Sequence, residues 1–322
     1  MKNYFFESFD GEKINCYEWK PKGDILGCVQ IVHGLQEHGL RYKKFAEYLT
    51  KHGYLVLASD QRLHGLTAGD SLSKTKIKNV FPIMVKDQML IADMLHKKYN
   101  KPLVVFGHSY GSFITQSFIQ NYQKLNGAIL CGSGFMRRLD TFFGSIASDI
   151  AVMLKGGEAD AKLIEDMVIN NYNQSFKGNG NWISANLENL KDIENDPLCG
   201  VPLCANFYWS MFKNIRALYD KKDISKIDKN MPILIASGKD DPVGQMGKST
   251  MKLYKFYKEC GLNAEIKLYE NMRHEILNED KNQIVYQDML SFINNAILSS
   301  KENHMQSGYN DADHRVDNYQ MV

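Results

Sequence analysis

The sequence predicts an α/β fold with a mostly parallel central sheet flanked by helices and an inserted helical cap. Short apolar runs, such as 25–32, 54–58 and 103–106, are typical of strands that are buried on both faces of a sheet. Longer stretches with helical spacing of apolar residues alternate with these runs, which favours parallel βα units. Between 135 and 225 no strand-like run occurs, and several helical stretches follow one another.

The first part of the chain is expected to alternate between strands and helices. Asp10-Gly11 is a dipeptide that favours tight turns, so strands 4–9 and 12–19 should form a hairpin. The next expected elements are strand 25–32, helix 41–52, strand 54–58, helix 82–99, strand 103–106, a helical stretch that includes 113–119, and strand 128–131. Because the carboxyl ends of parallel strands meet at one edge of a sheet, ligands should bind there.

The second part of the chain divides into a cap, a return to the sheet and a tail. Helices are expected over 140–154, 158–171, 183–192 and 204–219, then strand 232–236, helix 246–260, strand 264–269 and a last helix over 276–298. We therefore expect a core from 1–134 and 226–299, with 135–225 as the inserted helical cap. The polar residues 300–322 are expected to be a disordered tail without a catalytic role.

Composition narrows the class of protein. The chain has 322 residues, 44% of them hydrophobic and 24% charged, which is ordinary for a globular protein. A net charge of +2 gives no electrostatic case for a nucleic-acid partner. The first residues do not resemble a signal peptide, and no apolar run is long enough to span a membrane. The six cysteines have no metal-binding spacing, so we expect reduced thiols, no metal site and a cytoplasmic protein.

A candidate nucleophile follows the strand at 103–106. The segment Gly107-His108-Ser109-Tyr110-Gly111 has the G-x-S-x-G pattern of a nucleophile elbow, between an expected strand and an expected helix. Such a turn holds the serine in a strained conformation, with its Oγ exposed above the sheet. Glycine two residues before and two residues after the serine leaves room for the close approach of strand and helix. The five-residue pattern alone is weak evidence for a nucleophile, so the prediction depends on finding a base and an acid at suitable places in the chain.

A serine hydroxyl needs an adjacent base, and His274 is the best placed of the nine histidines. It follows the last expected strand and comes just before the expected last helix, in a loop that could carry an imidazole over the elbow. The other histidines are less suitable: they precede the nucleophile, lie on expected helices, stand inside the elbow or belong to the tail (His33, His38, His64; His52, His96; His108; His304, His314).

The base needs an acid that fixes its tautomer, and two aspartates follow strand 232–236. We prefer Asp241 to Asp240 because the following Pro242 holds Asp241 extended and fixes its direction. The order Ser109, Asp241, His274 is that of the α/β-hydrolases and differs from both major serine protease orders. An oxyanion hole would then use the backbone N–H of Tyr110, after the nucleophile, and that of Leu35, after strand 25–32, which leaves both side chains free to line an acyl pocket.

These residues resemble a known family. The run from His33 to Tyr42 resembles the HGxxEHxxRY signature of monoacylglycerol lipases and related bacterial lysophospholipases. Four further segments resemble that family: Asp60 to Gly65 with Leu63 in place of glycine, Gly107 to Ser112 with Tyr110 for methionine and Ser112 for glycine, Ser237 to Gly244, and Arg273 to Glu279. The resemblance covers most of 10–298 and is poor across the cap. It implies that Asp241 is the triad acid, and that Glu37, Arg41 and Tyr42 order a loop.

The resulting hypothesis is a serine hydrolase that cleaves carboxylic esters of lipids, monoacylglycerols or lysophospholipids, through an acyl-enzyme on Ser109. No cofactor or metal is expected. The aromatic cap could shield an acyl chain and make transient contact with a membrane surface. The alternatives are a short-chain carboxylesterase or a peptidase on the same fold, and, in another class, a non-catalytic binding protein.

Overall fold

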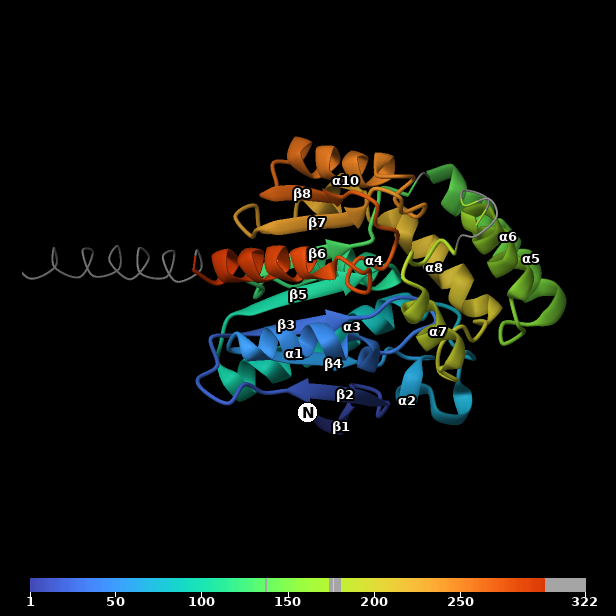
Figure 1. Ribbon diagram of the computed structural model, residues 1–322. Coiled ribbons are helices and arrows are strands. Elements are labelled where there is room, and N and C mark those ends of the chain that lie inside the picture. The colour runs from blue at the N-terminus through green and yellow to red at the C-terminus, as the bar shows by residue number, and fades with distance from the viewer. Residues whose placement is uncertain (137, 174–175, 177–180, 299–322) are drawn as a thin grey trace, which may run out of the picture.

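An eight-stranded sheet forms the centre of the protein (Figure 1). The computed structural model describes residues 1–136, 138–173, 176 and 181–298. The strand order is β1-β2-β4-β3-β5-β6-β7-β8, with β1 and β2 antiparallel to their neighbours and the others parallel. The strands are β1 (Lys2–Glu7), β2 (Lys13–Trp19), β3 (Gly27–Val32), β4 (Tyr54–Ser59), β5 (Leu103–His108), β6 (Gly127–Cys131), β7 (Ile233–Gly238) and β8 (Ala264–Tyr269). The predicted α/β fold with a mostly parallel sheet is confirmed.

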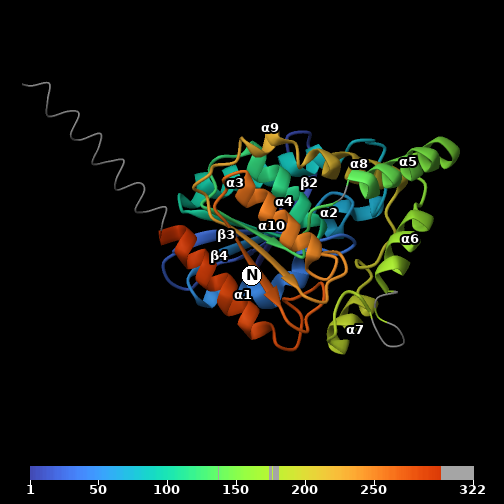
Figure 2. The ribbon, with the colours of Figure 1, turned by 90° about the horizontal axis from the view of Figure 1, so that it is seen from above.

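Helices cover both faces of this sheet, and the strands are apolar on both sides for that reason. In β5, Leu103 and Val105 join the core under α3 (Phe81–Tyr99), α4 (Tyr110–Asn121) and α10 (Lys248–Glu259). Val104 and Phe106 join the opposite core, under α1 (Lys43–Lys51) and the helix over 282–298. Figure 2 shows these two groups of helices on opposite sides of the sheet. Alternate residues of one strand therefore serve two cores.

The segment between β6 and β7 is helical and lies to one side of the sheet. It contains α5 (Arg138–Lys155), α6 (Lys162–Asn173), α7 (Leu187–Asn195), α8 (Ala205–Ala217) and α9 (Lys221–Ile224). In Figure 1, α5 to α8 gather beyond the carboxyl ends of the parallel strands. Shorter helical turns follow β3 and β4: η1 (Gly39–Tyr42), α2 (Gly65–Ala68) and η2 (Gly69–Ser71). These elements surround the edge where the candidate residues meet.

The last helix was predicted to begin at 276, and this is wrong: it begins at 282. Residues 274–281 form bends and turns, because their backbone and side chains bond to the segment between β6 and β7 instead of continuing a helix. The Glu275 N–H donates to the carbonyl oxygen of Ile183 at 2.9 Å. The Glu279 carboxylate accepts hydrogen bonds from the backbone N–H groups of Ala185 and Arg273. His274 therefore stands in a loop that the segment between β6 and β7 holds in place, and not directly before a helix.

Some further features bear on earlier expectations. All six cysteines are free thiols. Among the helices of the described residues, none has both the length and the apolar character needed to cross a membrane. The tail that was expected to be disordered, 300–322, lies outside the described residues. The strands that precede and follow the helical segment, β6 and β7, are hydrogen-bonded neighbours in the sheet.

Candidate active site

Ser109 lies at the turn between β5 and α4, in a backbone conformation that is rare for a non-glycine residue. Its φ is +52° and its ψ is −121°. Only glycine fits at positions 107 and 111, because any larger residue would clash with its neighbours. A Cβ on Gly111 would come within 2.1 Å of the Val32 carbonyl oxygen, and one on Gly107 within 2.2 Å of Thr115 Oγ1. The strained turn therefore has the form of a nucleophile elbow.

Asp241 and His274 form a buried pair at the carboxyl ends of β7 and β8. His274 Nδ1 lies 3.0 Å from Asp241 Oδ2, and both side chains are buried. Asp241 Oδ2 also accepts a hydrogen bond from the Ser237 hydroxyl at 2.8 Å, and Oδ1 accepts one from the Val243 N–H at 2.9 Å. The carboxylate is thus held from three sides, and its orientation toward His274 is fixed.

The electrostatics of this pair determine which imidazole nitrogen carries the proton. Burial alone would raise the pKa of Asp241, but the charge of His274 and hydrogen bonds from His274, Ser237 and Val243 lower it below the usual value. An ionised carboxylate can only accept hydrogen bonds, so His274 Nδ1 must be the donor. In the described part of the chain, His274 Nε2 is buried and has no hydrogen-bond partner. Its lone pair is therefore free to act as a base.

The elbow and the base meet at Gly132, just after β6. The Ser109 N–H donates to the Cys131 carbonyl oxygen at 2.9 Å. A Cβ on Gly132 would lie 2.9 Å from His274 Cε1, and the rings of His108 and His274 are 4.8 Å apart. No hydrogen bond joins the Ser109 hydroxyl to His274 among the described residues. The structure thus brings the three predicted residues to one edge of the sheet, with the serine–histidine bond not formed.

The loop after β3 lies against the same elbow. A Cβ on Gly34 would be 3.1 Å from Ser109 Cβ, so the backbone at Gly34 and Leu35 passes directly beside the nucleophile. Tyr110 is the first residue of α4, where helix geometry leaves the N–H without an intrahelical acceptor. Both predicted oxyanion-hole amides, those of Leu35 and Tyr110, belong to backbone segments that flank Ser109.

The Tyr110 side chain was expected to be free to line an acyl pocket, and instead it is part of the core. Only 3% of it is exposed. Its ring packs at 6.0 Å from that of Phe81 and 5.0 Å from that of Phe207, and its hydroxyl donates to Met84 Sδ. The phenol therefore fills the junction between α3, α4 and α8.

Glu37 organises the loop after β3. Its Oε1 accepts hydrogen bonds from the Gly34 N–H at 2.5 Å and from the Tyr42 hydroxyl at 2.7 Å, and its Oε2 pairs with Arg41 at 2.8 Å. Burial would raise the pKa of Glu37, but hydrogen bonding to His108 and the charge of Arg41 hold it well below its usual value. These contacts match the loop-ordering role that the family resemblance implies for Glu37, Arg41 and Tyr42.

Contacts from the helical segment between β6 and β7 to the loop that carries His274 were not foreseen from the sequence. The Trp182 ring lies 5.0 Å from that of His274. Arg41 from the loop after β3 pairs with Glu275 at 2.7 Å, and Glu275 also accepts a hydrogen bond from the Asn189 side chain. No periodicity or motif marks Trp182 or Asn189, because their partners are distant in sequence. Asp240, the less favoured of the two candidate acids, has an exposed side chain.

Two buried histidines near the site should make stability depend on pH. His33 Nε2 accepts a hydrogen bond from the Gln61 N–H at 2.8 Å. If Nε2 were protonated, two N–H groups would point at each other and this hydrogen bond would be lost. Burial lowers the pKa of His33 to about 3 and that of His64 to about 4. Since the unfolded chain takes up these protons near about pH 6.5, stability should fall as the pH drops from there toward 4, by up to ~1.4 kcal/mol per pH unit for each histidine.

Urea denaturation at several pH values checks this expectation. His33→Gln removes one titrating group and should reduce the pH dependence by roughly half. His52→Gln, at an exposed histidine on α1's C-terminal end, should leave it unchanged. An unfolding free energy that does not vary between about pH 6.5 and 4.5 would contradict the prediction.

Comparison with known proteins shows which family and which solved structures this chain is similar to. A family profile described as serine aminopeptidase S33 matches residues 23–281. A monoglyceride lipase homolog of Monkeypox virus is 25% identical over 84% of this chain and 90% of its own. Human monoglyceride lipase is 32% identical, but the alignment covers only 33% of this chain and 34% of the human protein. The crystal structure of a carboxyl esterase from Bacillus coagulans, in complex with glycerol, superposes with a TM-score of 0.82 at 26% identity, over 92% of this chain and 98% of that one.

Proposed function

The chain belongs to the serine aminopeptidase S33 family of hydrolases, and from this premise we propose that it cleaves carboxylic esters of lipids, monoacylglycerols or lysophospholipids. The observation that carries the proposal is the buried Asp241–His274 pair packed beside the elbow that holds Ser109. The similarity to a viral monoglyceride lipase homolog and to a carboxyl esterase supports an ester substrate.

In the proposed reaction, Ser109 Oγ attacks the ester carbonyl. A rotation of the serine side chain lets its hydroxyl donate to His274 Nε2, which takes the proton and passes it to the leaving alcohol. Asp241 keeps the Nδ1–H tautomer and stabilises the imidazolium. The N–H groups of Leu35 and Tyr110 hold the oxyanion, and water then releases the acyl group from Ser109. Every step uses side chains and backbone amides, so we propose no cofactor and no metal for catalysis.

We also propose that residues 135–225 act as a cap over a core formed by 1–134 and 226–299, and that the cap touches a lipid surface. Four apolar side chains on one face of α5 point to solvent at helical spacing: Ile146, Ile150, Met153 and Leu154. Met153 is 77% exposed and Leu154 is 71% exposed. Such a stripe is costly in water and suits an interface with lipid.

A peptidase is the second candidate, because the family carries an aminopeptidase name. A peptidase that recognises a free amino terminus needs a carboxylate that is available beside the nucleophile. Of the carboxylates near the elbow in the described part of the chain, Glu37 and Glu275 are both paired with Arg41, and Asp241 is paired with His274. The arrangement therefore favours an uncharged ester over a peptide.

A substrate series tests the proposed function. Turnover should rise with acyl length across p-nitrophenyl esters, and should extend to monoacylglycerols or lysophospholipids but not to amino-acid p-nitroanilides. Presenting the same lipid in vesicles should increase turnover for the wild type, and Ile150→Ser/Met153→Ser should lose that increase while keeping its rate on a soluble ester. Preference for the shortest ester would favour a short-chain carboxylesterase. Turnover of the anilides would favour a peptidase, and inertness toward all of them a binding protein.

We propose a cytoplasmic setting for this activity. The six cysteines are free, and Cys16, Cys28 and Cys131 are buried in the sheet, as expected of thiols that are not used for disulfides. The net charge of +2 gives no electrostatic case for a nucleic-acid partner.

A further inference from the structure

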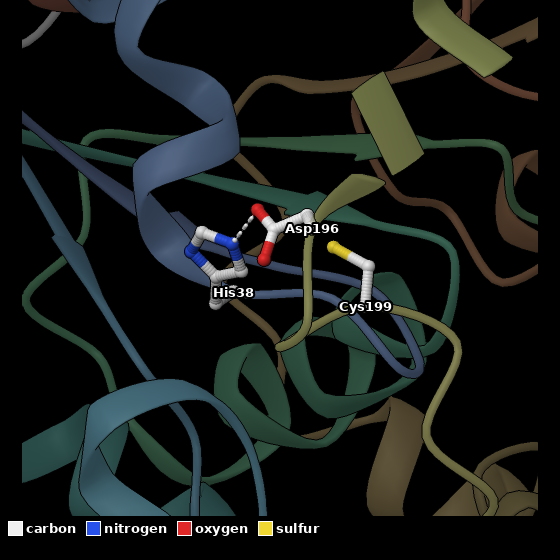
Figure 3. Close-up of side chains that lie close together, drawn as sticks. All are labelled: His38, Asp196 and Cys199. Atoms are coloured by element: carbon white, nitrogen blue, oxygen red, sulfur yellow. Dashed lines mark hydrogen bonds and ion pairs between the residues drawn. The ribbon is translucent and has the colours of Figure 1, made fainter. Parts of the chain in front are cut away.

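Three potential metal ligands from distant parts of the chain converge beside the loop after β3. They are His38, just before η1, and Asp196 and Cys199, in the segment after α7. One ligand atom from each lies within 4.8 Å of the others. Figure 3 shows the Cys199 sulfur turned toward the Asp196 carboxylate, whose other side faces the imidazole of His38. Sequence spacing gave no sign of this cluster, because His38 is far from the other two.

Asp196 and Cys199 are presented by one tight turn. The Cys199 N–H donates to the Asp196 carbonyl oxygen at 3.0 Å, and the Leu198 N–H donates to Asp196 Oδ1 at 2.9 Å. Two residues separate the two ligands, which is the spacing that lets paired side chains of a turn chelate one ion. The Gly200 N–H donates to the Gln36 carbonyl oxygen at 2.9 Å, so the turn is fastened to the loop that carries His38.

We propose that His38, Asp196 and Cys199 form a binding site for one Zn²⁺ ion. An imidazole nitrogen, a carboxylate oxygen and a thiolate are the ligand types that zinc prefers. Zinc–ligand distances of about 2.0–2.3 Å require ligand atoms roughly 3.3–3.8 Å apart, so side-chain shifts on the order of 1 Å would complete the site. Water or a substrate group would fill the fourth position.

Charge around the cluster is compatible with such an ion. Binding through His38 Nε2 replaces its 2.8 Å contact with Asp196 Oδ2. The proton on Nε2 is then transferred to Nδ1 by exchange with solvent, and the thiol proton of Cys199 is released to solvent. The ion's two positive charges are then balanced by the carboxylate and the thiolate. The neighbouring Arg41 does not add an uncompensated charge, because it is paired with both Glu37 and Glu275.

The site would connect the cap to the loop of the proposed oxyanion hole. His38 follows Leu35 by three residues, whereas Asp196 and Cys199 belong to the proposed cap. A bound ion would therefore fix the cap segment against this loop. On the proposed function, zinc should slow the turnover of lipid substrates, which must enter beneath the cap. Without the ion, the His38–Asp196 contact holds the same two segments together more weakly.

The test is a titration of Zn²⁺ into the reduced full-length protein in competition with a zinc-sensing dye. The wild type should bind one ion at this site, and Cys199→Ser and His38→Gln should each weaken binding by about tenfold or more. Substituting Co²⁺ should give a near-ultraviolet sulfur-to-cobalt charge-transfer band that Cys199→Ser removes. Cys260→Ser is the matched control: this partly buried thiol follows α10 and should leave both signals unchanged.

Two outcomes would overturn the site: zinc binding that Cys199→Ser leaves intact, or binding that is lost when His304 and His314 are both replaced by alanine. Circular dichroism of each variant verifies that it is folded. The titration needs no substrate, so its result is independent of the proposed ester hydrolysis. A protein that binds zinc through Cys199 but hydrolyses no ester would keep the metal site and refute the function. Zinc binding without any slowing of lipid turnover would refute only the link to the cap.

Discussion

Ser109→Ala should abolish ester hydrolysis, with kcat reduced by about 10⁴-fold or more. The substitution removes only the hydroxyl group, and the strained φ of +52° is a property of the turn that alanine also has to adopt. The variant should therefore keep its fold while losing the group that forms the acyl-enzyme. The measurement is turnover of a p-nitrophenyl ester, together with covalent labelling by a fluorophosphonate that mass spectrometry locates on the peptide containing residue 109.

Ser117→Ala is the matched control, because Ser117 lies in helix α4, which follows the elbow, and is half-buried like the nucleophile. It should retain both turnover and labelling. His274→Ala should lose as much activity as Ser109→Ala, since the serine then has no base. Labelling of Ser109→Ala at the wild-type rate would show that another residue is the nucleophile.

The sheet and the positions of the three candidate residues could be predicted because their signals are local. β3, β4 and β5 are buried on both faces, so each is a largely apolar run, interrupted in β3 by Gln30. A strand followed by a glycine-flanked serine marks the elbow. Asp241 and His274 follow strands β7 and β8, and parallel strands end at the same edge. Because each of the three residues follows a parallel strand, the sequence predicts that they meet at this edge of the sheet.

The parts that could not be predicted depend on contacts between distant segments. Trp182 packs on His274, and Arg41 joins Glu275, but neither contact leaves a periodic pattern in the chain. The last helix begins later than its apolar spacing suggests because Glu279 binds backbone N–H groups of Ala185 and Arg273. The helix propensity of a segment does not show that hydrogen bonds to distant parts of the chain will replace its first helical turn. The His38–Asp196 contact was missed for the same reason.

Asp241→Asn should reduce kcat/KM by about 10⁴-fold, whereas Asp240→Asn should have little effect. Asp241 Oδ1 accepts from the Val243 N–H and Oδ2 accepts from His274 Nδ1–H, so the carboxylate uses both oxygens as acceptors. An amide has one oxygen and one NH₂ group. If the NH₂ group faced Val243, two donors would oppose each other, so the amide oxygen should turn to Val243 and the NH₂ group to His274. His274 Nδ1 must then accept, and its proton moves to Nε2.

With the proton on Nε2, His274 can no longer take one from Ser109, although every heavy atom of the site is nearly in place. Asp240 has an exposed side chain, and its backbone N–H donates to the Met272 carbonyl oxygen. Comparing kcat/KM of the two asparagine variants, with urea midpoints as a check on folding, tests the assignment. The reverse ranking would make Asp240 the acid. Equal and small losses would mean that the tautomer of His274 does not depend on a carboxylate at all, and the proposed proton transfer would have to be abandoned.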